Sequence, residues 1–440
     1  MWLLALLVPL RPLAGQDSPL QWPLPAARQP VFPHVLIGVR ELAGLLGKGN
    51  VIPLDARDAA VYEKGHLPGA VPAWTPQEEI GGQARVRSLL AERGISGGET
   101  VVLYGDPDRE RTAALFWLLH WAGCPEVRIL NGDLAAWIAA GHPLETQPSR
   151  RPKAAFREPA HETAAVDAAW VASAYGEAGV ELLDLRDARG WDHWQTPPLF
   201  GAGHIPYSLP FDPNSLLPAG DGWPNPAELR RRLGTLGPRP GDPVKLDSTF
   251  VLYGEDPRDP RIGLGYLLLT LAGLEARIFP GGWQEWIADA GHPVVRIVSA
   301  TALAALLRRE NPGLKQDRPP RGMILLDLRE ARDFAIGHLP GARNLPYPAF
   351  AKTFERVVAE GWPAADRATT TLVLYCYGPE CVRSRKAGAQ AARLGFRNVI
   401  WFRGGVREWR DAGLPLRKTP AATAPVERVS PGAAAVHPPP

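Results

Sequence analysis

The chain has 440 residues, more than a single hydrophobic core usually serves, so its length predicts about three domains. With 45% hydrophobic and 22% charged residues it has the composition of a soluble globular protein, and a net charge of +3 is too small to predict a nucleic-acid or membrane partner. Three cysteines exclude a disulfide scaffold, and no Cys/His cluster has the spacing of a structural zinc site, so we expect neither a metal nor a cofactor.

The N-terminus reads "MWLLALLVPLRPLAGQ", a short apolar stretch followed by the small residues Ala14 and Gly15. This order is typical of a secretory signal peptide, and the stretch is too short to span a bilayer. No Lys or Arg precedes the apolar run, which favours the alternative of an unstructured N-terminus. We predict a signal peptide over residues 1–20 and export, with the periplasm as the destination.

The rest of the chain repeats one order of features three times, which indicates a tandem array. In each copy a strand ends in an acidic-x-Arg turn, a Gly-His turn follows, and a second apolar strand leads into a loop and a helix. The first strands are "VIPLDARD" (51–58), "VELLDLRD" (180–187) and "MILLDLRE" (323–330), and the second strands are "TVVLYG" (100–105), "TFVLYG" (249–254) and "TLVLYC" (371–376). A third strand and a tryptophan helix close each copy.

Short apolar strands that alternate with helices predict an α/β fold, with a small parallel sheet in each copy and helices on both of its faces. The expected boundaries are module 1 over 31–148, module 2 over 160–296 and module 3 over 297–418. The Ala/Pro-rich tail, 419–440, has few large apolar residues, and we expect it to be disordered.

The copies differ where the second strand ends. Modules 1 and 2 have Gly105 and Gly254 there, whereas module 3 has Cys376. Ligands of parallel sheets bind beyond the carboxyl ends of strands, and backbone N–H groups at the start of a helix lower the pKa of a thiol. Cys376 is therefore the candidate nucleophile, and Arg383 is the candidate ligand for an oxyanion.

This combination resembles the rhodanese family of sulfurtransferases over roughly residues 35–417, as three tandem rhodanese-like modules. The matching features are the D-x-R and Gly-His turns, the strand-terminal cysteine, the Arg-Ser pair that opens the next helix, and the Gly-Gly and Trp segment. The resemblance implies that Cys376 takes a sulfane sulfur as a persulfide. It further implies that Arg383, Ser384 and Gly378 bind the donor, and that modules 1 and 2 have no catalytic cysteine.

The loop "CYGPECVR" departs from the family pattern, because six residues separate Cys376 from Arg383 where four are usual. The enlarged loop carries a second thiol, Cys381. This thiol could resolve a persulfide on Cys376 by forming a disulfide, could itself be the nucleophile, or could be a passive small residue. Cys124 has no basic neighbour on its own turn and is interpreted as a structural thiol.

The sequence thus predicts a sulfurtransferase that moves sulfane sulfur from thiosulfate or a persulfide donor to a thiol or cyanide acceptor through a persulfide on Cys376. The expected partners are a small anionic donor and a protein or thiol acceptor, without nucleic acid or membrane. Two alternatives stay open. One is a thiol-disulfide redox protein that uses Cys376 and Cys381 as a couple, and the other is a non-catalytic rhodanese-like binding protein.

Overall fold

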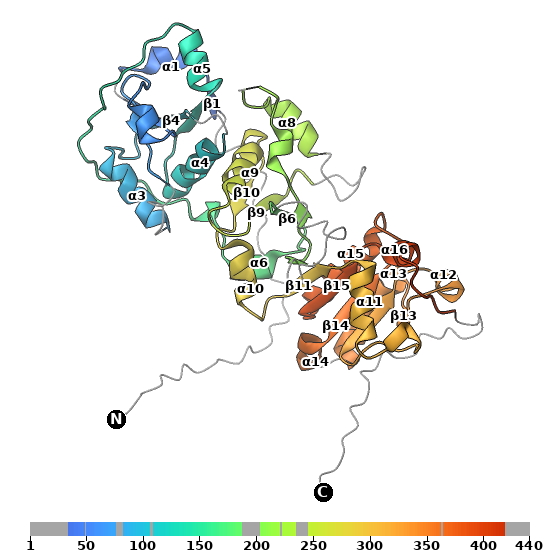
Figure 1. The fold of residues 1–440 in the computed structure, drawn as a ribbon. Coiled ribbons are helices and arrows are strands. Elements are labelled where there is room, and N and C mark those ends of the chain that lie inside the picture. Colours follow the sequence, from blue (N-terminus) through green and yellow to red (C-terminus); the bar gives the residue numbers. More distant parts are fainter. Residues whose placement is uncertain are drawn as a thin grey trace, which may run out of the picture.

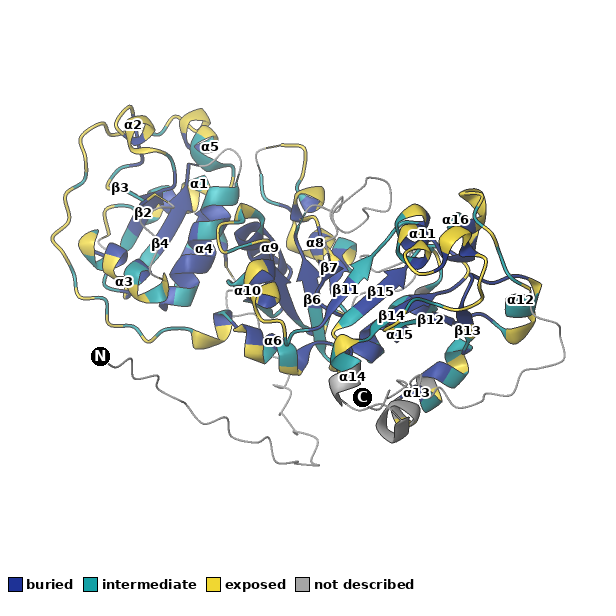
Figure 2. Ribbon diagram, turned by 60° about the horizontal axis from the view of Figure 1, so that its bottom comes forward, coloured by how far each residue is buried: buried dark blue, intermediate teal, exposed yellow. Residues whose placement is uncertain are grey.

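The computed structural model describes residues 34–48, 50–75, 82–105, 109–186, 203–220, 222–234, 245–361 and 364–418. The predicted signal peptide and the predicted disordered tail lie outside these residues. Within them the chain forms three α/β modules, with module 2 between modules 1 and 3 (Figure 1). The buried parts of all three lie mainly on the strands and on the inner sides of the helices (Figure 2). The α/β fold with parallel sheets is confirmed.

Module 1 has a five-stranded parallel sheet of order β1-β5-β4-β2-β3. Its strands are β1 (Leu36–Ile37), β2 (Val51–Asp55), β3 (Val71–Pro72), β4 (Thr100–Tyr104) and β5 (Val127–Leu130), and its helices are α1 (Val39–Leu45), α2 (Ala59–Tyr62), α3 (Gly82–Glu92), α4 (Glu110–Ala122) and α5 (Asp133–Ala139).

Module 2 has a four-stranded parallel sheet of order β10-β9-β6-β8. Its elements are the 3-10 helix η2 (Glu162–Ala164), α6 (Ala168–Ala174), β6 (Val180–Asp184), β7 (Gly203–His204), β8 (Leu209–Pro210), η3 (Pro213–Leu216), α8 (Pro226–Leu233), β9 (Thr249–Tyr253), α9 (Pro260–Leu271), β10 (Ala276–Ile278) and α10 (Gly282–Ala288). Of these, β7 pairs outside this sheet.

Module 3 contributes most of a six-stranded sheet of order β13-β12-β14-β15-β11-β7. Its elements are β11 (Val294–Ile297), α11 (Ala300–Arg308), η4 (Pro312–Leu314), β12 (Met323–Asp327), α12 (Ala331–Ile336), β13 (Ala342–Asn344), α13 (Tyr347–Gly361), α14 (Ala364–Thr369), β14 (Thr371–Tyr375), α15 (Val382–Arg393), β15 (Asn398–Phe402) and α16 (Gly405–Asp411).

Alternation along β14 explains why helices cover both faces of this sheet. Leu372 and Leu374 belong to a core cluster with residues of α13 and α15, whereas Val373 and Tyr375 belong to a second cluster with residues of α11 and α16. Successive side chains of a strand point to opposite faces, so an uninterrupted apolar strand needs cover on both. Cys376 follows Tyr375 and therefore lies at the carboxyl edge of a sheet that is packed on both faces.

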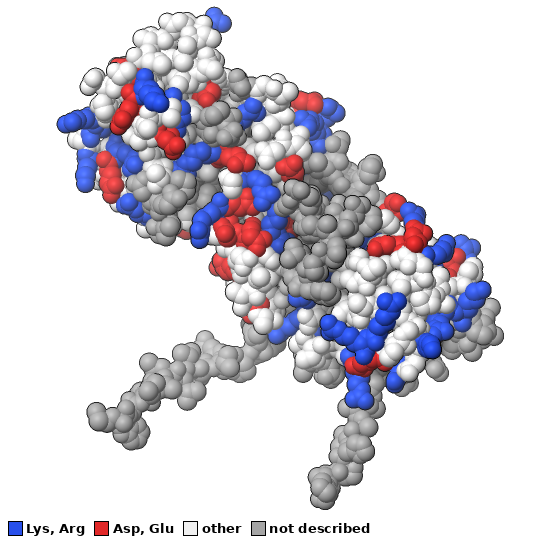
Figure 3. All heavy atoms as spheres, in the orientation of Figure 1, with Lys and Arg blue, Asp and Glu red and all other residues white. Residues whose placement is uncertain are grey.

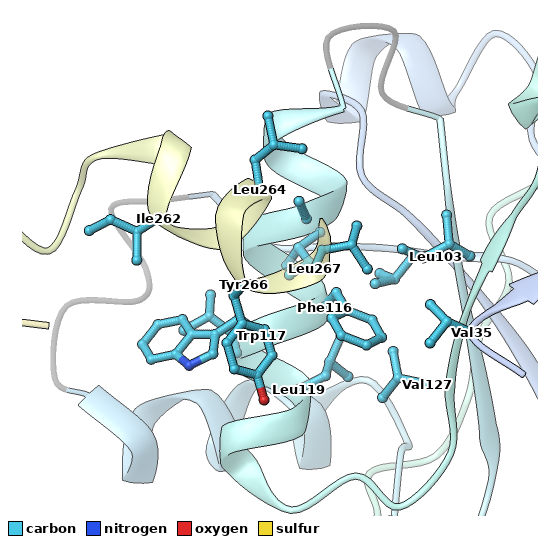
Figure 4. Close-up of a cluster of buried hydrophobic side chains, with 14 of the residues drawn as sticks. Val35, Leu103, Phe116, Trp117, Leu119, Val127, Ile262, Leu264, Tyr266 and Leu267 are labelled. Carbon is cyan, nitrogen blue, oxygen red and sulfur yellow. The ribbon is translucent and has the colours of Figure 1, made fainter. Parts of the chain in front are cut away.

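The two junctions between modules are built differently. Modules 1 and 2 share one hydrophobic core, in which α4 lies against α9 and Phe116 and Trp117 meet Tyr266 and Leu267 (Figure 4). Modules 2 and 3 share a strand, because β11 pairs in parallel with β15 of module 3 and antiparallel with β7 of module 2. Modules 2 and 3 are thus joined by a continuous sheet.

Candidate active site

The site lies where three neighbouring strands of module 3 end. Asp327, Tyr375 and Phe402 are in register across β12, β14 and β15, and the loop of residues 376–381 leads from β14 into α15. Because parallel strands end at the same edge, the residues that follow these strands converge there. Both loop cysteines, predicted to lie at this edge, are found there.

A tight turn brings the second thiol back over the first. The N–H of Cys381 donates to the carbonyl of Gly378 at 3.0 Å, which closes a β-turn with Pro379 at its second position. Proline favours this position because its φ is fixed near the value that the turn needs. The two thiols lie close together as a result, and a hydrogen bond between them is the largest cause of the pKa shift of each. The two extra residues of the enlarged loop are therefore accommodated in a turn that pairs the thiols.

The N-terminus of α16 fixes the orientation of the loop backbone. The N–H groups of Val406 and Arg407 donate to the carbonyls of Cys376 and Tyr377, both at 3.1 Å. In a trans peptide the C=O and the N–H point in opposite directions. With the Cys376 carbonyl held by α16, the N–H of Tyr377 points away from α16, and it lowers the pKa of both thiols.

Gly405 makes this contact possible. Its φ is +58°, and a Cβ at this position would lie 2.4 Å from the carbonyl oxygen of Cys376. A side chain would be strained by the left-handed backbone and would collide with the loop at the same time. The Gly-Gly segment that the sequence repeats in modules 2 and 3 thus lets a helix start approach the cysteine loop.

The two thiols differ in burial and in proton affinity. Cys376 is 1% exposed, whereas Cys381 is partly exposed. The hydrogen bond between them lowers the pKa of Cys381, and although burial opposes the shift, the N–H groups of Arg383 and Tyr377 and the Arg383 charge bring this pKa to about 6. The same hydrogen bond, followed by burial, raises the pKa of Cys376. Cys381 therefore ionises first, and Cys376 keeps its proton and donates it.

Arginines surround the loop, and carboxylates face them. Arg383 lies 3.5 Å from Glu330, and Arg407 lies 2.9 Å from Glu380. The side chains of Arg383 and Arg407 are 40% and 58% exposed. Exposed pairs of this kind hold their partners weakly, so either arginine can turn to an anionic ligand at little cost. On the face of the molecule in Figure 3 acidic and basic side chains likewise occur together over each of the three modules.

The remaining predicted residues have distinct positions. Gly378 is buried and supplies the carbonyl of the turn. Ser384 is also buried, and its hydroxyl accepts a hydrogen bond from the indole N–H of Trp401 at 3.0 Å, which ties α15 to β15. Cys124 is fully buried, and burial raises its pKa. Sequence reasoning missed Tyr377, Arg407 and Gly405, of which only Gly405 left a signal, in the repeated Gly-Gly segment.

In the other two modules a carboxylate lies next to the glycine that stands at the position of Cys376. A Cβ at Gly254 would lie 2.7 Å from the Asp259 carboxylate, and a Cβ at Gly105 would lie 2.7 Å from that of Asp55. The backbone arrangement persists, because the Gly254 carbonyl accepts from Trp283 N–H at 3.0 Å as the Cys376 carbonyl does from Val406. Module 2 therefore keeps the backbone arrangement of the site, with the Asp259 carboxylate near the place where module 3 has a sulfur. The Asp55 carboxylate of module 1 belongs to the Asp-x-Arg turn, which module 3 also has, with Asp327.

No cluster of His, Cys, Asp and Glu that could hold a metal ion occurs among the described residues. The helices in that part of the chain include none with the length and apolar character needed to cross a membrane.

Repeated α/β modules with one thiol pair at the carboxyl edge of a parallel sheet define a class of protein, the tandem α/β enzymes with a single cysteine-based site. The family model of the rhodanese-like domain matches residues 38–140, 167–289 and 304–412. The chain therefore belongs to the rhodanese family, with three rhodanese-like domains, and is an enzyme of the rhodanese type.

Several curated proteins are similar to this chain. The "Putative thiosulfate sulfurtransferase SseB" of Mycobacterium tuberculosis is 31% identical over 60% of this chain and 97% of that protein. The "Thiosulfate sulfurtransferase" of Corynebacterium glutamicum is 28% identical over 60% of this chain and 91% of that protein. A solved structure, the anaerobic ergothioneine biosynthesis enzyme from Chlorobium limicola, overlaps loosely, with a TM-score of 0.48 and 20% identity over 59% of this chain and 69% of that one.

Proposed function

We propose that this protein is a sulfurtransferase that moves sulfane sulfur from thiosulfate or a persulfide donor to a thiol or cyanide acceptor, through a persulfide on a loop cysteine of module 3. The observation that carries the proposal is the Cys376/Cys381 pair at the start of α15, beside the N–H groups of Tyr377 and Arg383 and the Arg383 guanidinium. The curated relatives named for thiosulfate sulfur transfer support the same chemistry.

The geometry favours Cys381, the alternative nucleophile, over Cys376. Cys381 is the partly exposed sulfur, and its pKa is lowered by the Cys376 thiol and by two backbone N–H groups. Cys376 is shielded from solvent, and its pKa is raised by the same hydrogen bond. A donor in solution meets the Cys381 thiolate first, and only the thiolate is nucleophilic.

In the first half of the reaction the Cys381 thiolate attacks the outer sulfur of thiosulfate. The S–S bond of the donor breaks, and sulfite leaves with the electron pair. The N–H groups of Tyr377 and Arg383 and the Arg383 guanidinium stabilise the negative charge near the sulfur. In the second half an acceptor thiolate or cyanide takes the terminal sulfur, and the Cys381 thiolate is restored.

Intact-mass measurement after incubation with thiosulfate tests the proposal. The reduced protein is expected to release sulfite and to take one sulfur atom onto the loop, and C376S should keep that sulfur until cyanide removes it as thiocyanate. C381S should gain none, whereas C124S, a matched substitution at the buried thiol outside the site, should behave like the wild type. Absence of both sulfite release and sulfur gain with every donor, while the protein stays folded, would contradict the proposal.

A thiol-disulfide redox protein is the second candidate, and the direct contact between the two thiols favours it. The same mass experiment separates the two. A redox protein would lose two protons between Cys376 and Cys381 on treatment with a disulfide oxidant, but it would release no sulfite from thiosulfate and take up no sulfur from a persulfide.

A further inference from the structure

We propose that Cys376 is an internal resolving thiol that attacks the Cys381 persulfide, closes a Cys376–Cys381 disulfide and releases the transferred sulfur as hydrosulfide. This inference rests on the proposed function. It reverses the roles that the sequence suggests, in which Cys381 resolves a persulfide on Cys376. It also changes the product of the reaction. The sulfane sulfur leaves as hydrosulfide and is not transferred to an external thiol or cyanide.

Position is the first argument. The Cys376 side chain is 1% exposed, so a donor in solution does not reach it, yet it is hydrogen-bonded to the Cys381 sulfur. A thiol that contacts one sulfur and little solvent is placed to react with that sulfur alone. The attacked atom is the inner sulfur of the persulfide, the Sγ of Cys381, which Cys376 already contacts.

Rigidity is the second argument. The turn from Gly378 to Cys381 is closed by a backbone hydrogen bond of 3.0 Å, and α16 holds the Cys376 and Tyr377 carbonyls through bonds of 3.1 Å. The partners are thus held together before the reaction. An internal thiol in such a short loop has an effective concentration on the order of millimolar or more. It therefore competes well with thiols in solution.

Charge is the third argument. Glu330 lies beside Arg383 and Glu380 beside Arg407 at the rim of the loop. An acceptor thiolate, like the donor, has to reach Cys381 past this rim of mixed charge. Cys376 reaches the Cys381 sulfur from inside the loop without passing the rim, and it becomes nucleophilic as its proton passes to the terminal sulfur of the persulfide.

The step balances without an added oxidant. The persulfide Cys381–S–S⁻ and the thiol Cys376–SH give the disulfide Cys381–S–S–Cys376 and HS⁻. The S–S bond within the persulfide breaks, its electron pair leaves with the terminal sulfur, and the Cys376 proton goes to that sulfur. Two cysteine thiols are oxidised and the sulfane sulfur is reduced. A thiol reductant must then reduce the disulfide before the next cycle.

The first test is a single turnover with thiosulfate, without oxygen or reductant. We expect the wild type to release sulfite and sulfide in about equal amounts, near one equivalent of each per chain. Trypsin cuts after Arg367 and Arg383, so residues 368–383 carry both cysteines in one peptide. That peptide should lose two protons. C376S should release sulfite but no sulfide, and should keep the added sulfur on Cys381.

Two results of this test would contradict different claims, one the resolving role of Cys376 and the other the proposed function. If the wild type releases sulfite and keeps a stable persulfide on Cys381 until an external thiol is added, the resolving role of Cys376 is overturned and the proposed function stands. If no donor yields sulfite or sulfur gain, the proposed function fails. Because C376S changes a buried residue, its fold is checked by circular dichroism, and the wild-type product ratio tests the role of Cys376 without any substitution.

A second arm runs the step in reverse and needs no donor. The protein is oxidised to the disulfide and treated with sodium sulfide without oxygen. We expect the peptide of residues 368–383 to take up one sulfur, located on Cys381 by fragmentation between the two cysteines. C124S is the matched control and should give the same result. If the Cys376–Cys381 disulfide does not form, or if sulfur is taken up on Cys376 alone, the inference is overturned whatever the first test gives.

Discussion

The reactivity of the Cys381 sulfur depends on individual hydrogen-bond donors around it. The Cys376 thiol is the strongest of them, and the N–H groups of Arg383 and Tyr377 add to it against the cost of burial. Arg383 is the second residue of α15, so its N–H has no partner within the helix and is free to face the sulfur. The same contacts keep Cys376 protonated, so two chemically identical side chains differ in proton affinity.

This difference in pKa predicts how the alkylation of Cys381 depends on pH. Because the pKa of Cys381 is lowered to about 6, its thiolate forms as the pH rises through about 6, and alkylation by iodoacetamide should rise to a plateau there. C376A removes the thiol donor and should move the midpoint up by about one unit or more, whereas C376S keeps a hydroxyl donor and should move it less. Rates of alkylation of the peptide of residues 368–383 measure this, and a wild-type midpoint near 8.5 would contradict it.

A second prediction at this scale concerns Gly405. In G405A the methyl group would lie 2.4 Å from the Cys376 carbonyl, at a φ of +58°, so the loop must move away from α16. We expect a loss of more than about 2 kcal/mol in unfolding free energy and at least a tenfold fall in sulfur transfer. Gly413 has a φ of +68° and no atom within 4 Å of an added Cβ. G413A should therefore lose about 1–2 kcal/mol and keep its activity, and equal losses of activity in both would refute the argument.

Much of the site was predictable from single residues, and its details were not. Cys376 and Cys381 stood out because module 3 alone has thiols after its second strand. Which of them is exposed depends on the turn of residues 378–381 and on hydrogen bonds from α16, which is more than 20 residues further along the chain. Burial of one thiol and ionisation of the other are tertiary effects, so the sequence left both assignments open.

At the scale of elements, the three copies share a backbone scaffold but not its chemistry. In modules 2 and 3 a glycine with a positive φ lets the last helix of the module donate to the carbonyl at the end of the second strand. The Asp-x-Arg pair is also common to all three modules, with the arginine bound to its own aspartate and to the carbonyl of Gly65, Gly203 or Gly337. Because module 2 shares this backbone but has the Asp259 carboxylate beside Gly254, a cysteine alone would not restore a site there.

G254C, made in a C376S/C381S background, tests this statement. The new side chain would meet the Asp259 carboxylate, to which a Cβ would come within 2.7 Å. Contact with a carboxylate disfavours the thiolate and raises the pKa of a thiol. We expect no sulfur gain from thiosulfate and alkylation slower than that of a free cysteine. The matched control is C376S, which keeps Cys381 in module 3, and sulfur gain by G254C would show that the carboxylate does not block the site.

The sequence predicted the repeated elements well because each strand is a short apolar run at the same place in every copy. It did not predict that β11 belongs to two modules. Val295 pairs with His204 on one side and with Val399 on the other, and nothing in "HPVVRIV" distinguishes such a strand from an ordinary one. Partners of a strand are set by tertiary packing, whereas its existence is set by local composition.

At the scale of the whole molecule, the modules are not independent units. The core of modules 1 and 2 is continuous, and the buried hydroxyl of Tyr266 on α9 is hydrogen-bonded to the His120 ring on α4. Module 3 is attached through β11 and through the hydrogen bond from Arg393 to the Gly176 carbonyl at 2.9 Å. A substitution that disrupts the first junction should therefore destabilise module 2 directly and should affect the cysteine loop least.

Substitution of Gly263 on α9 tests what the packing of α9 against α4 contributes to stability and to activity. A Cβ there would lie 2.5 Å from the Ala114 Cα and 2.6 Å from its N, so in G263A the two helices must separate. We expect a loss of about 1–3 kcal/mol in the unfolding free energy of modules 1 and 2, which should show as a lower midpoint in calorimetry. The rate of sulfite release from thiosulfate at 25 °C should change less than about twofold, because the cysteine loop belongs to module 3.

Gly44 in α1 supplies the control, since an added Cβ there has no atom within 4 Å. G44A should be neutral or stabilising by up to about 1 kcal/mol, because alanine is the better helix former. If G263A and G44A unfold alike, the close approach of α4 and α9 does not hold the modules together. If G263A abolishes sulfite release while the protein stays folded, the cysteine loop depends on the distant junction, and the modules act as one unit in catalysis as well as in stability.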